Sequence, residues 1–244
     1  MSGFIINPYS NNLSIPEGMV LWLAAWKETG YSDGDAMATI KDWSGNGRDF
    51  TQGTSVSRPQ YKTGILNSQP AFRFDGTDDF VECTAFMSGS VAEMFCVLKI
   101  PTGIGSSNWG WMKFSGATLS DHFSFFGTAY STFGGTNRTN YTVNTAASES
   151  GLVQQIVAQG GASAWKWYEA GNVEKANMTQ TMDWGTSRHL LGASSANSDA
   201  SSVSAYFNGW ICELQIFNSE RTTAQRNSIL ADFQTRYGLS YTSF

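Results

Sequence analysis

The 244-residue sequence has no long apolar run and no basic excess, and each absence excludes a class of protein. No apolar run approaches the ~20 residues that span a bilayer, so we expect no membrane partner. The formal net charge of -5 argues against a nucleic-acid partner, which calls for a basic stripe. The first residues lack the charged and apolar regions of a signal peptide, so we expect no Sec export.

Cysteine is also scarce, with only Cys83, Cys96 and Cys212 in the whole chain. Three thiols cannot all pair, and each of them stands in an apolar, strand-like run. Buried cysteine behaves as a small apolar residue. A chain of this length buries roughly 70% of its unfolded surface and needs no disulfide staples. We therefore expect free buried thiols and synthesis in a reducing cytosol.

Glycine and aromatic residues, by contrast, are abundant. There are 25 glycines against 5 prolines, and aromatic residues make up 14% of the chain. This composition is typical of many strands joined by turns, and all-β sandwiches often reach this length as one domain. We predict an all-β domain over 19–244, preceded by an N-terminal arm over 1–18. The apolar Phe4-Ile5-Ile6 of the arm suggests that it docks on its own domain or on a neighbour, and we hypothesise that it docks on a partner.

The stretch 71–81 has the clearest local pattern. Phe72 and Phe74 point to one face of an extended segment, which Asp75-Gly76 interrupts. Apolar alternation around an Asp-Gly pair predicts a β-hairpin. The carboxylates of Asp75, Asp78 and Asp79 are expected to accept hydrogen bonds from backbone N–H groups of the turn, which makes it a structural element.

Other segments are apolar on both faces or alternate in polarity, as strands do. They are 19–23, 38–43, 94–100, 109–112, 122–126, 152–158 and 164–168. Residues 127–150 are polar and glycine-rich, and we interpret them as a long surface excursion. In the closing strand, 205–218, alternation predicts that Glu213 and Gln215 lie on one face. The opposite face is expected to carry Trp210, Cys212, Leu214 and Ile216.

After this strand the period of the apolar residues becomes helical. One stripe carries Ile229, Leu230, Phe233 and Tyr237. Thr222 or Thr223 can cap the start of a helix, and Gly238 can end it in the left-handed conformation. We predict one α-helix over 223–237.

Four of these segments together resemble a known family. Leu21-Trp22-Leu23, Asp42 to Asp49 and Phe72 to Phe80 look like the N-terminal half of a concanavalin A-like, laminin-G-type jelly roll. Ala205 to Asn218 resembles the closing strand of that family. The resemblance implies a jelly-roll β-sandwich of two antiparallel sheets with one C-terminal helix. It is specific for the fold and says little about function.

Some enzymes of this fold hydrolyse glycosidic bonds, and retaining ones need two carboxyls about 5 Å apart. In glucanases of the fold these carboxyls project from one strand as Glu-x-Asp-x-Glu. The sequence has no such cluster, because Glu213 is the only acid on its strand. His122 and His189 adjoin no nucleophile motif, and phosphate-binding and dinucleotide-binding motifs are missing. We predict a protein that is not an enzyme.

Aspartates in the first third of the chain are the one pattern that suggests a metal. Laminin-G relatives often carry calcium at a loop rim, and calcium takes six to eight oxygen ligands. Carboxylates of turns more often cap backbone N–H groups, so we predict no cofactor and keep calcium as the alternative. The aspartates concerned are Asp33, Asp35, Asp42, Asp49, Asp75, Asp78 and Asp79.

Sugar binding needs a flat aromatic ring beside planar polar groups. Trp109 and Trp111 are candidate rings, although the tryptophans of a β-rich chain mostly belong to its core. Trp165 and Trp167 are assigned to the core. The other candidates for a glycan site are Tyr130, Asn137, Arg138, Asn197 and Asp199.

The opening Phe4-Ile5-Ile6-Asn7-Pro8-Tyr9 resembles the start of phage proteins that carry this domain. This resemblance implies a non-enzymatic virion protein, a capsid decoration or tail component, whose partners are other virion proteins and host-surface glycans. Virion proteins sit on symmetric lattices, so a homo-oligomer such as a trimer is expected. The alternative is a bacterial surface adhesin or a carbohydrate-binding accessory module of a hydrolase, exported by another route.

Overall fold

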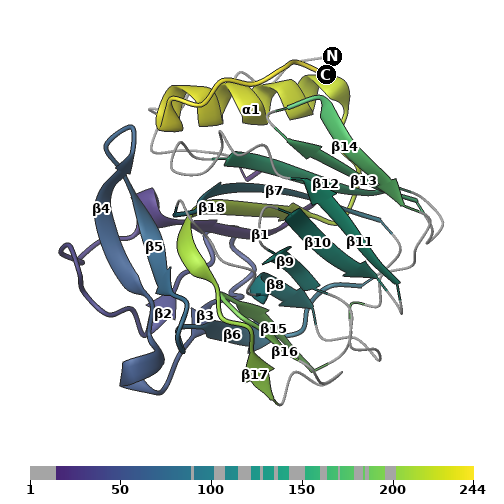
Figure 1. Cartoon of the computed structure of the whole chain (residues 1–244). Coiled ribbons are helices and arrows are strands. Elements are labelled where there is room, and N and C mark those ends of the chain that lie inside the picture. The colour runs from purple at the N-terminus through teal and green to yellow at the C-terminus, as the bar shows by residue number, and fades with distance from the viewer. Residues whose placement is uncertain are drawn as a thin grey trace.

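Two antiparallel sheets face each other, and a single α-helix lies across the outer face of one of them (Figure 1). The computed structural model describes residues 15–88, 91–101, 108–114, 122–126, 129–134, 137–142, 152–159, 164–169, 171–178, 184, 187–195 and 202–244. Within these ranges the predicted all-β sandwich with one C-terminal helix is confirmed. None of the described helices is long and apolar enough to cross a membrane.

Sheet A, the sheet beneath the helix, has the order β14-β13-β12-β7-β18-β5-β4, and β1 also pairs with β18. In that order the strands are β14 (Val173–Met178), β13 (Ala164–Glu169), β12 (Leu152–Gln159), β7 (Ala92–Lys99), β18 (Asn208–Phe217), β5 (Gln69–Asp75), β4 (Gln60–Leu66) and β1 (Met19–Ala24). Strand β7 is buried on both faces, as its continuous apolar sequence predicts.

Sheet B has the order β11-β10-β9-β8-β15-β6-β3-β2. These strands are β11 (Asn137–Thr142), β10 (Ala129–Gly134), β9 (His122–Phe126), β8 (Asn108–Phe114), β15 (Arg188–Leu191), β6 (Val81–Thr84), β3 (Phe50–Thr51) and β2 (Thr39–Ile40). The remaining elements are the small pair β16 (Ser194–Ser195) and β17 (Val203–Ser204), and the 3-10 turns η1 (Ala25–Lys27) and η2 (Ser55–Ser57).

The core has two parts, one on each side of sheet A. Between the sheets, residues such as Phe72, Phe74 and Phe50 are fully buried. Between sheet A and the helix, Phe95 and Val97 of β7 pack beneath the apolar stripe of the helix. Sheet A is therefore covered on both faces along much of its length.

Helix α1 (Thr223–Tyr237) has the predicted boundaries and both predicted caps. The Thr222 side chain accepts a hydrogen bond from the Gln225 backbone N–H, and the Gln225 side chain accepts one from Thr222, which forms a capping box. Gly238 adopts the left-handed conformation with φ 67° and donates to the Gln234 carbonyl. The residues of the predicted stripe are buried.

The hairpin predicted around Asp75-Gly76 is wrong. Strand β5 pairs with β4 and β18 in sheet A, whereas β6 pairs with β3 and β15 in sheet B. The Asp-Gly turn carries the chain from one sheet to the other, so its two arms do not pair. Local alternation cannot distinguish this crossover from a hairpin, because both bury the same apolar residues.

The alternation predicted for the closing strand also fails, because β18 contains a bulge. Its register shifts between Ile211 and Glu213. Cys212 and Trp210 consequently face the helix, whereas Leu214 belongs to the core between the sheets. An extra residue in a strand shifts the alternation by one, so the residues before the bulge point to the opposite face from the one that simple alternation predicts.

Two further predictions need correction. The excursion proposed for 127–150 contains β10 and β11, which pair with each other and extend sheet B. The strand proposed for 38–43 is shorter, since β2 spans only Thr39–Ile40. The three cysteines are free and buried, as the sequence predicts.

Candidate functional site

Trp111, one of the two proposed sugar-stacking rings, is fully buried in the core between the sheets. A ring without exposed surface cannot stack on a sugar from solvent. Its strand approaches β16 closely, since a Cβ on Gly110 would lie 2.4 Å from the Ser194 Cβ. Trp111 therefore serves packing, the role that most tryptophans have in such a chain.

Four of the other proposed glycan residues lie on strands of sheet B, at positions that the strand register gives. Trp109 of β8 and Tyr130 of β10 both pair with Phe125 of β9, so the register aligns them in one row of sheet B. Asn137 and Arg138 pair with Gly134 and Phe133 at the other end of the β10–β11 pair. Asn197 and Asp199 lie outside the described residues, as do the side chains of Trp165 and Trp167.

Sheet A carries a row of polar side chains around Trp210, a tryptophan that was not among the candidate glycan residues. Trp210 of β18 pairs with Arg73 of β5 on one side and with Lys99 of β7 on the other. Gln60 of β4 extends the row, opposite Arg73. Residues directly opposite in antiparallel strands share a face, so these four form one surface, the Trp210 row. All four are partly or fully exposed.

The cations of the Trp210 row lie against the indole ring. The Arg73 guanidinium carbon is 4.6 Å and the Lys99 Nζ 5.5 Å from the ring centroid. Arg73 also donates to the Asn208 Oδ1 at 2.7 Å and to the Gly209 carbonyl at 3.2 Å. The row thus offers one aromatic ring with guanidinium, amine and amide groups around it, which is the chemistry of polyol recognition.

A second surface cluster surrounds Lys27, the last residue of η1. Its Nζ lies 4.6 Å from the ring centroid of Trp22, 5.1 Å from that of Trp26 and 4.9 Å from that of Trp43. We call these three rings the Lys27 cage. Burial lowers the pKa of Lys27, and the nearby Glu213 carboxylate opposes that shift.

Glu213 lies beneath this cage and is fully buried. Its carboxylate accepts hydrogen bonds from the Trp22 Nε1 at 2.8 Å, the Trp26 Nε1 at 3.0 Å and the Tyr237 hydroxyl at 2.7 Å. Arg236 and Gln215 donate to it as well. A single acid thereby joins β1, η1, β18 and α1, and these donors offset the cost of burying its charge.

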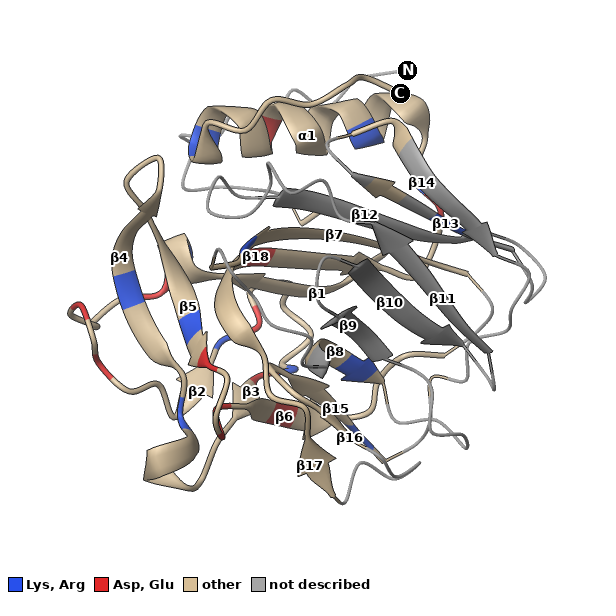
Figure 2. Cartoon of the chain, viewed as in Figure 1, with Lys and Arg blue, Asp and Glu red and all other residues tan. Residues whose placement is uncertain are grey.

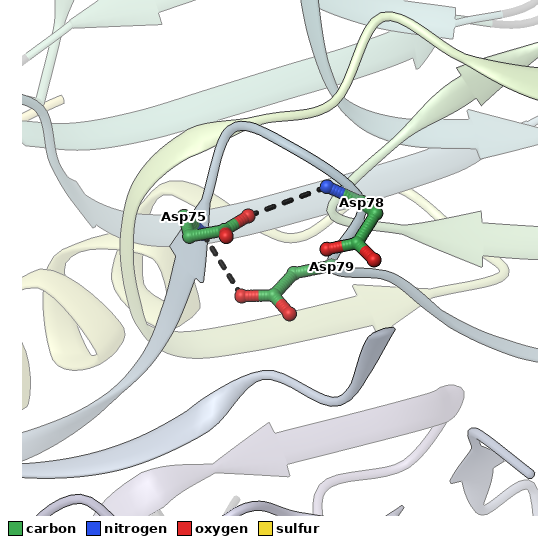
Figure 3. Close-up of side chains that lie close together, drawn as sticks. All are labelled: Asp75, Asp78 and Asp79. Atoms are coloured by element: carbon green, nitrogen blue, oxygen red, sulfur yellow. Dashed lines mark hydrogen bonds between the residues drawn. The ribbon is translucent and has the colours of Figure 1, made fainter. Parts of the chain in front are cut away.

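Three aspartates of the sheet crossover lie close together (Figure 3). Carboxylate oxygens of Asp75, Asp78 and Asp79 all lie within 4.8 Å of one another. The Asp75 Oδ1 accepts from the backbone N–H of Thr77 at 2.7 Å, and the Asp79 Oδ2 accepts from that of Asp75 at 2.9 Å. Burial raises the pKa of Asp79 to about 7, and the charges of its two neighbours add to this. The predicted capping role is confirmed for Asp75 and Asp79, whereas the Asp78 carboxylate accepts from the Ser57 hydroxyl at 3.3 Å.

The remaining aspartates named for calcium are held at other places. Asp42 accepts from the backbone N–H groups of Trp22 and Ser44, and Asp49 accepts from that of Asp42. Asp33 pairs with Lys62, and Asp35 caps the Ser32 N–H. Figure 2 shows acidic positions at several separate places in the loops around β4 and β5. Of the described residues, only the Asp75–Asp79 cluster has the spacing of a metal site.

No family model and no curated protein matches this sequence, but solved structures match the fold. The binding domain of botulinum neurotoxin DC in complex with rat synaptotagmin II is 12% identical, with a TM-score of 0.60 over 91% of this chain and 53% of that chain. A botulinum neurotoxin type C structure, whose cell entry is described as dependent upon two ganglioside molecules, is 10% identical with a TM-score of 0.60 over 90% and 52%.

A third similar structure is domain 4 of AbnA, a GH43 extracellular arabinanase from Geobacillus stearothermophilus, in complex with arabinotriose. It is 16% identical, with a TM-score of 0.55 over 82% of this chain and 100% of that chain. This chain spans about half of the toxin chains but the whole of the arabinanase domain. These likenesses show the fold of the chain, which is an antiparallel β-sandwich.

Proposed function

We propose that this protein is a carbohydrate-recognition module without catalytic activity. The observation that carries the proposal is the fold match to a domain in complex with arabinotriose, which extends over all of that domain. Similar structures also include a neurotoxin that is described as dependent on gangliosides, which are glycolipids. Two of the similar structures are thus described with a sugar or a glycolipid, which supports a sugar ligand for this chain.

The Trp210 row is the described surface that best fits a sugar. Where Arg73 and Lys99 leave it uncovered, the indole ring can pack against the apolar C–H face of a pyranose or furanose, while Arg73, Lys99 and Asn208 hydrogen-bond the hydroxyls. The flanking strands hold these groups in fixed register, so little conformational entropy is lost on binding. In Figure 1, most of β4 and β5 lies to one side of α1, and the side chains of the row are partly or fully exposed.

The lack of catalysis is part of the proposal. The crossover aspartates have carboxylate oxygens at the spacing of a glycosidase pair, but they accept hydrogen bonds from the backbone of their own turn. Carboxylates used in this way stabilise the turn. Incubation with chromogenic glycosides and polysaccharides is expected to release no product, and turnover that Asp79→Asn abolishes would contradict this.

We further propose that the module belongs to a virion, as a capsid decoration or tail component, with other virion proteins and host-surface glycans as partners. The opening residues 4–9 support this proposal through their resemblance to phage proteins. A homo-oligomer such as a trimer fits a symmetric particle. Deleting residues 2–12 is expected to reduce assembly measured by light scattering and co-sedimentation with particles. The alternative, an adhesin or hydrolase accessory module, predicts neighbouring genes for secretion in place of capsid genes.

A glycan array together with arabino-oligosaccharides tests the proposed recognition directly. Wild-type protein is expected to bind a defined set of glycans, and Trp210→Ala to weaken that binding roughly tenfold or more, about 1.4 kcal/mol. Tyr241→Ala, at a partly buried aromatic of the C-terminal tail, is the matched control. Loss through Trp109→Ala, with none through Trp210→Ala, would place the site on sheet B. Binding to no glycan would overturn the proposal.

A further inference from the structure

The Lys27 cage has the geometry of a cation site that the protein fills with its own side chain. Three indole rings surround one nitrogen at 4.6, 4.9 and 5.1 Å from their centroids. In the described part of the chain the Lys27 ammonium forms no ion pair, so the rings are its close contacts. Aromatic faces are the negative ends of the ring quadrupole and attract a cation at this distance.

The walls of the cage are held independently of Lys27. The Nε1 groups of Trp22 and Trp26 are both anchored on the buried Glu213 carboxylate. The Trp43 backbone N–H donates to the Trp22 carbonyl at 2.8 Å. The Arg236 guanidinium stacks on Trp26, 3.8 Å from its centroid. The cage is therefore expected to keep its shape when the lysine side chain leaves it.

The Lys27 ammonium has the positive charge that the indole faces attract, but its N–H donors find no good acceptors there. A lysine ammonium carries three N–H donors and is strongly hydrated, whereas indole faces accept hydrogen bonds poorly. A quaternary ammonium has the same charge, no N–H group and apolar methyls around the nitrogen. With N–C bonds of about 1.5 Å aimed at the rings, its methyl carbons would lie roughly 3.1–3.6 Å from the ring centroids, so the cage must widen by a few tenths of an ångström to reach the ~3.5–4.0 Å optimum for carbon contacts.

We propose that Trp22, Trp26 and Trp43 form a binding site for a quaternary ammonium group, such as the trimethylammonium of choline, which Lys27 occupies in the free protein. On binding, the flexible Lys27 side chain swings into solvent and the ligand takes its place. The buried Glu213 carboxylate beneath the rings attracts a cation, against the repulsion of Arg236, which pairs with it at 3.1 Å, and of Lys41, whose Nζ lies 4.8 Å from the Trp43 centroid. This site is separate from the Trp210 row and its ligand class differs from a sugar hydroxyl face.

Because Lys27 competes for the cage, removing it is expected to strengthen binding. The apparent affinity of a site is reduced by the fraction of molecules in which it is open. Choline and tetramethylammonium, titrated into the full chain by calorimetry, are expected to bind Lys27→Ala roughly tenfold more tightly than wild type. A purely structural lysine predicts no binding to either protein.

The matched control is Lys62→Ala, which removes a lysine paired with Asp33 outside the cage and should leave the choline affinity unchanged. Trp43→Leu is expected to abolish binding, and Trp43→Phe to keep part of it. Circular dichroism establishes folding of each variant, and Lys27→Ser is a second variant that empties the cage.

Two further probes decide between a cation site and a plain apolar pocket, and between ligand sources. The neutral carbon analogue of choline, 3,3-dimethylbutan-1-ol, is expected to bind at least roughly tenfold more weakly, because it has no charge. Equal affinity for this analogue, or no saturable choline binding by the cage-emptied variants, would overturn the proposal. Soluble phosphocholine and sedimented phosphatidylcholine vesicles then distinguish a free or polymer-borne head group from a lipid surface, and binding to either supports the site.

Discussion

Two buried carboxylates in this sandwich are stabilised in opposite ways. Glu213 is fully buried between sheet A and α1 and accepts hydrogen bonds from tryptophan, tyrosine, glutamine and arginine side chains. Asp79, 5% exposed at the sheet crossover, accepts one from the Asp75 backbone and has two carboxylates as neighbours. Burial therefore costs Asp79 more, and its pKa rises to about 7.

The difference shows what a buried acid needs. Removing a carboxylate from water costs several kcal/mol unless donors replace the lost solvation. Around Glu213 these donors come from its own strand, from the distant segment β1–η1 and from α1, and they join the helix to the sheet. Around Asp79 the neighbours belong to one short turn, so proton uptake relieves part of the cost. The first acid is a tertiary link and the second is a local cap.

The largest expected effect comes from removing the charge at the tertiary link. Glu213→Gln leaves Arg236 with Asp232 as its remaining carboxylate partner and offers the other donors a single acceptor oxygen. We expect the free energy of unfolding to fall by about 3–5 kcal/mol, measured by chemical denaturation. Glu220→Gln, at a more exposed acid that pairs with Arg226, is the control and should cost less than about 1 kcal/mol. Equal losses in the two variants would remove the distinction between the sites.

A smaller, pH-dependent effect is expected at Asp79. Its folded pKa of about 7 lies above the value of about 3.9 for an unfolded aspartate. Between these values the unfolded chain releases the proton while the folded chain keeps it, so this group lowers stability as pH rises from about 4 to 7. Asp79→Asn removes the charge, and its stability relative to wild type should increase across that window.

Thermal melts at pH 5 and pH 8 check this prediction. An electrostatic cost of about 1 kcal/mol corresponds to a Tm difference of roughly 2–4 °C in a chain of this size. Asp35→Asn, at an exposed loop carboxylate that caps Ser32, is the control. A Tm difference for Asp79→Asn that does not grow with pH would show that the Asp79 carboxyl is not strained by its burial.

The smallest effect is expected from calcium. The crossover aspartates already accept hydrogen bonds from their own turn, so we expect the Tm to stay the same, within about 1 °C, when calcium or a chelator is added. A rise in Tm with calcium that Asp78→Asn abolishes would instead make the cluster a metal site. The bound cation would then offset the cost of burying the Asp79 carboxylate, as the surrounding donors do for Glu213.

Sequence-based prediction succeeded where interactions between residues close in the chain determine the structure of a segment. Helix α1 was predicted from its cap, its stripe and Gly238, which all act within a few residues. The carboxylate caps of the Asp75 turn were predicted for the same reason. The candidate site was predicted less well: Trp111 is in the core, and Trp210 was assigned to the wrong face because a bulge is invisible to a period-of-two pattern.

The sequence by itself determined the class of fold, the one helix and its ends, the free thiols and the capping carboxylates. Only the tertiary structure decided that the Asp-Gly turn joins two sheets, that Trp210 stands between Arg73 and Lys99, and that three tryptophans enclose Lys27. The physical reason is the separation along the chain of the residues that interact. Backbone propensity and capping act between neighbours in the chain, whereas sheet order and side-chain clusters depend on contacts between residues as far apart as Trp22 and Glu213.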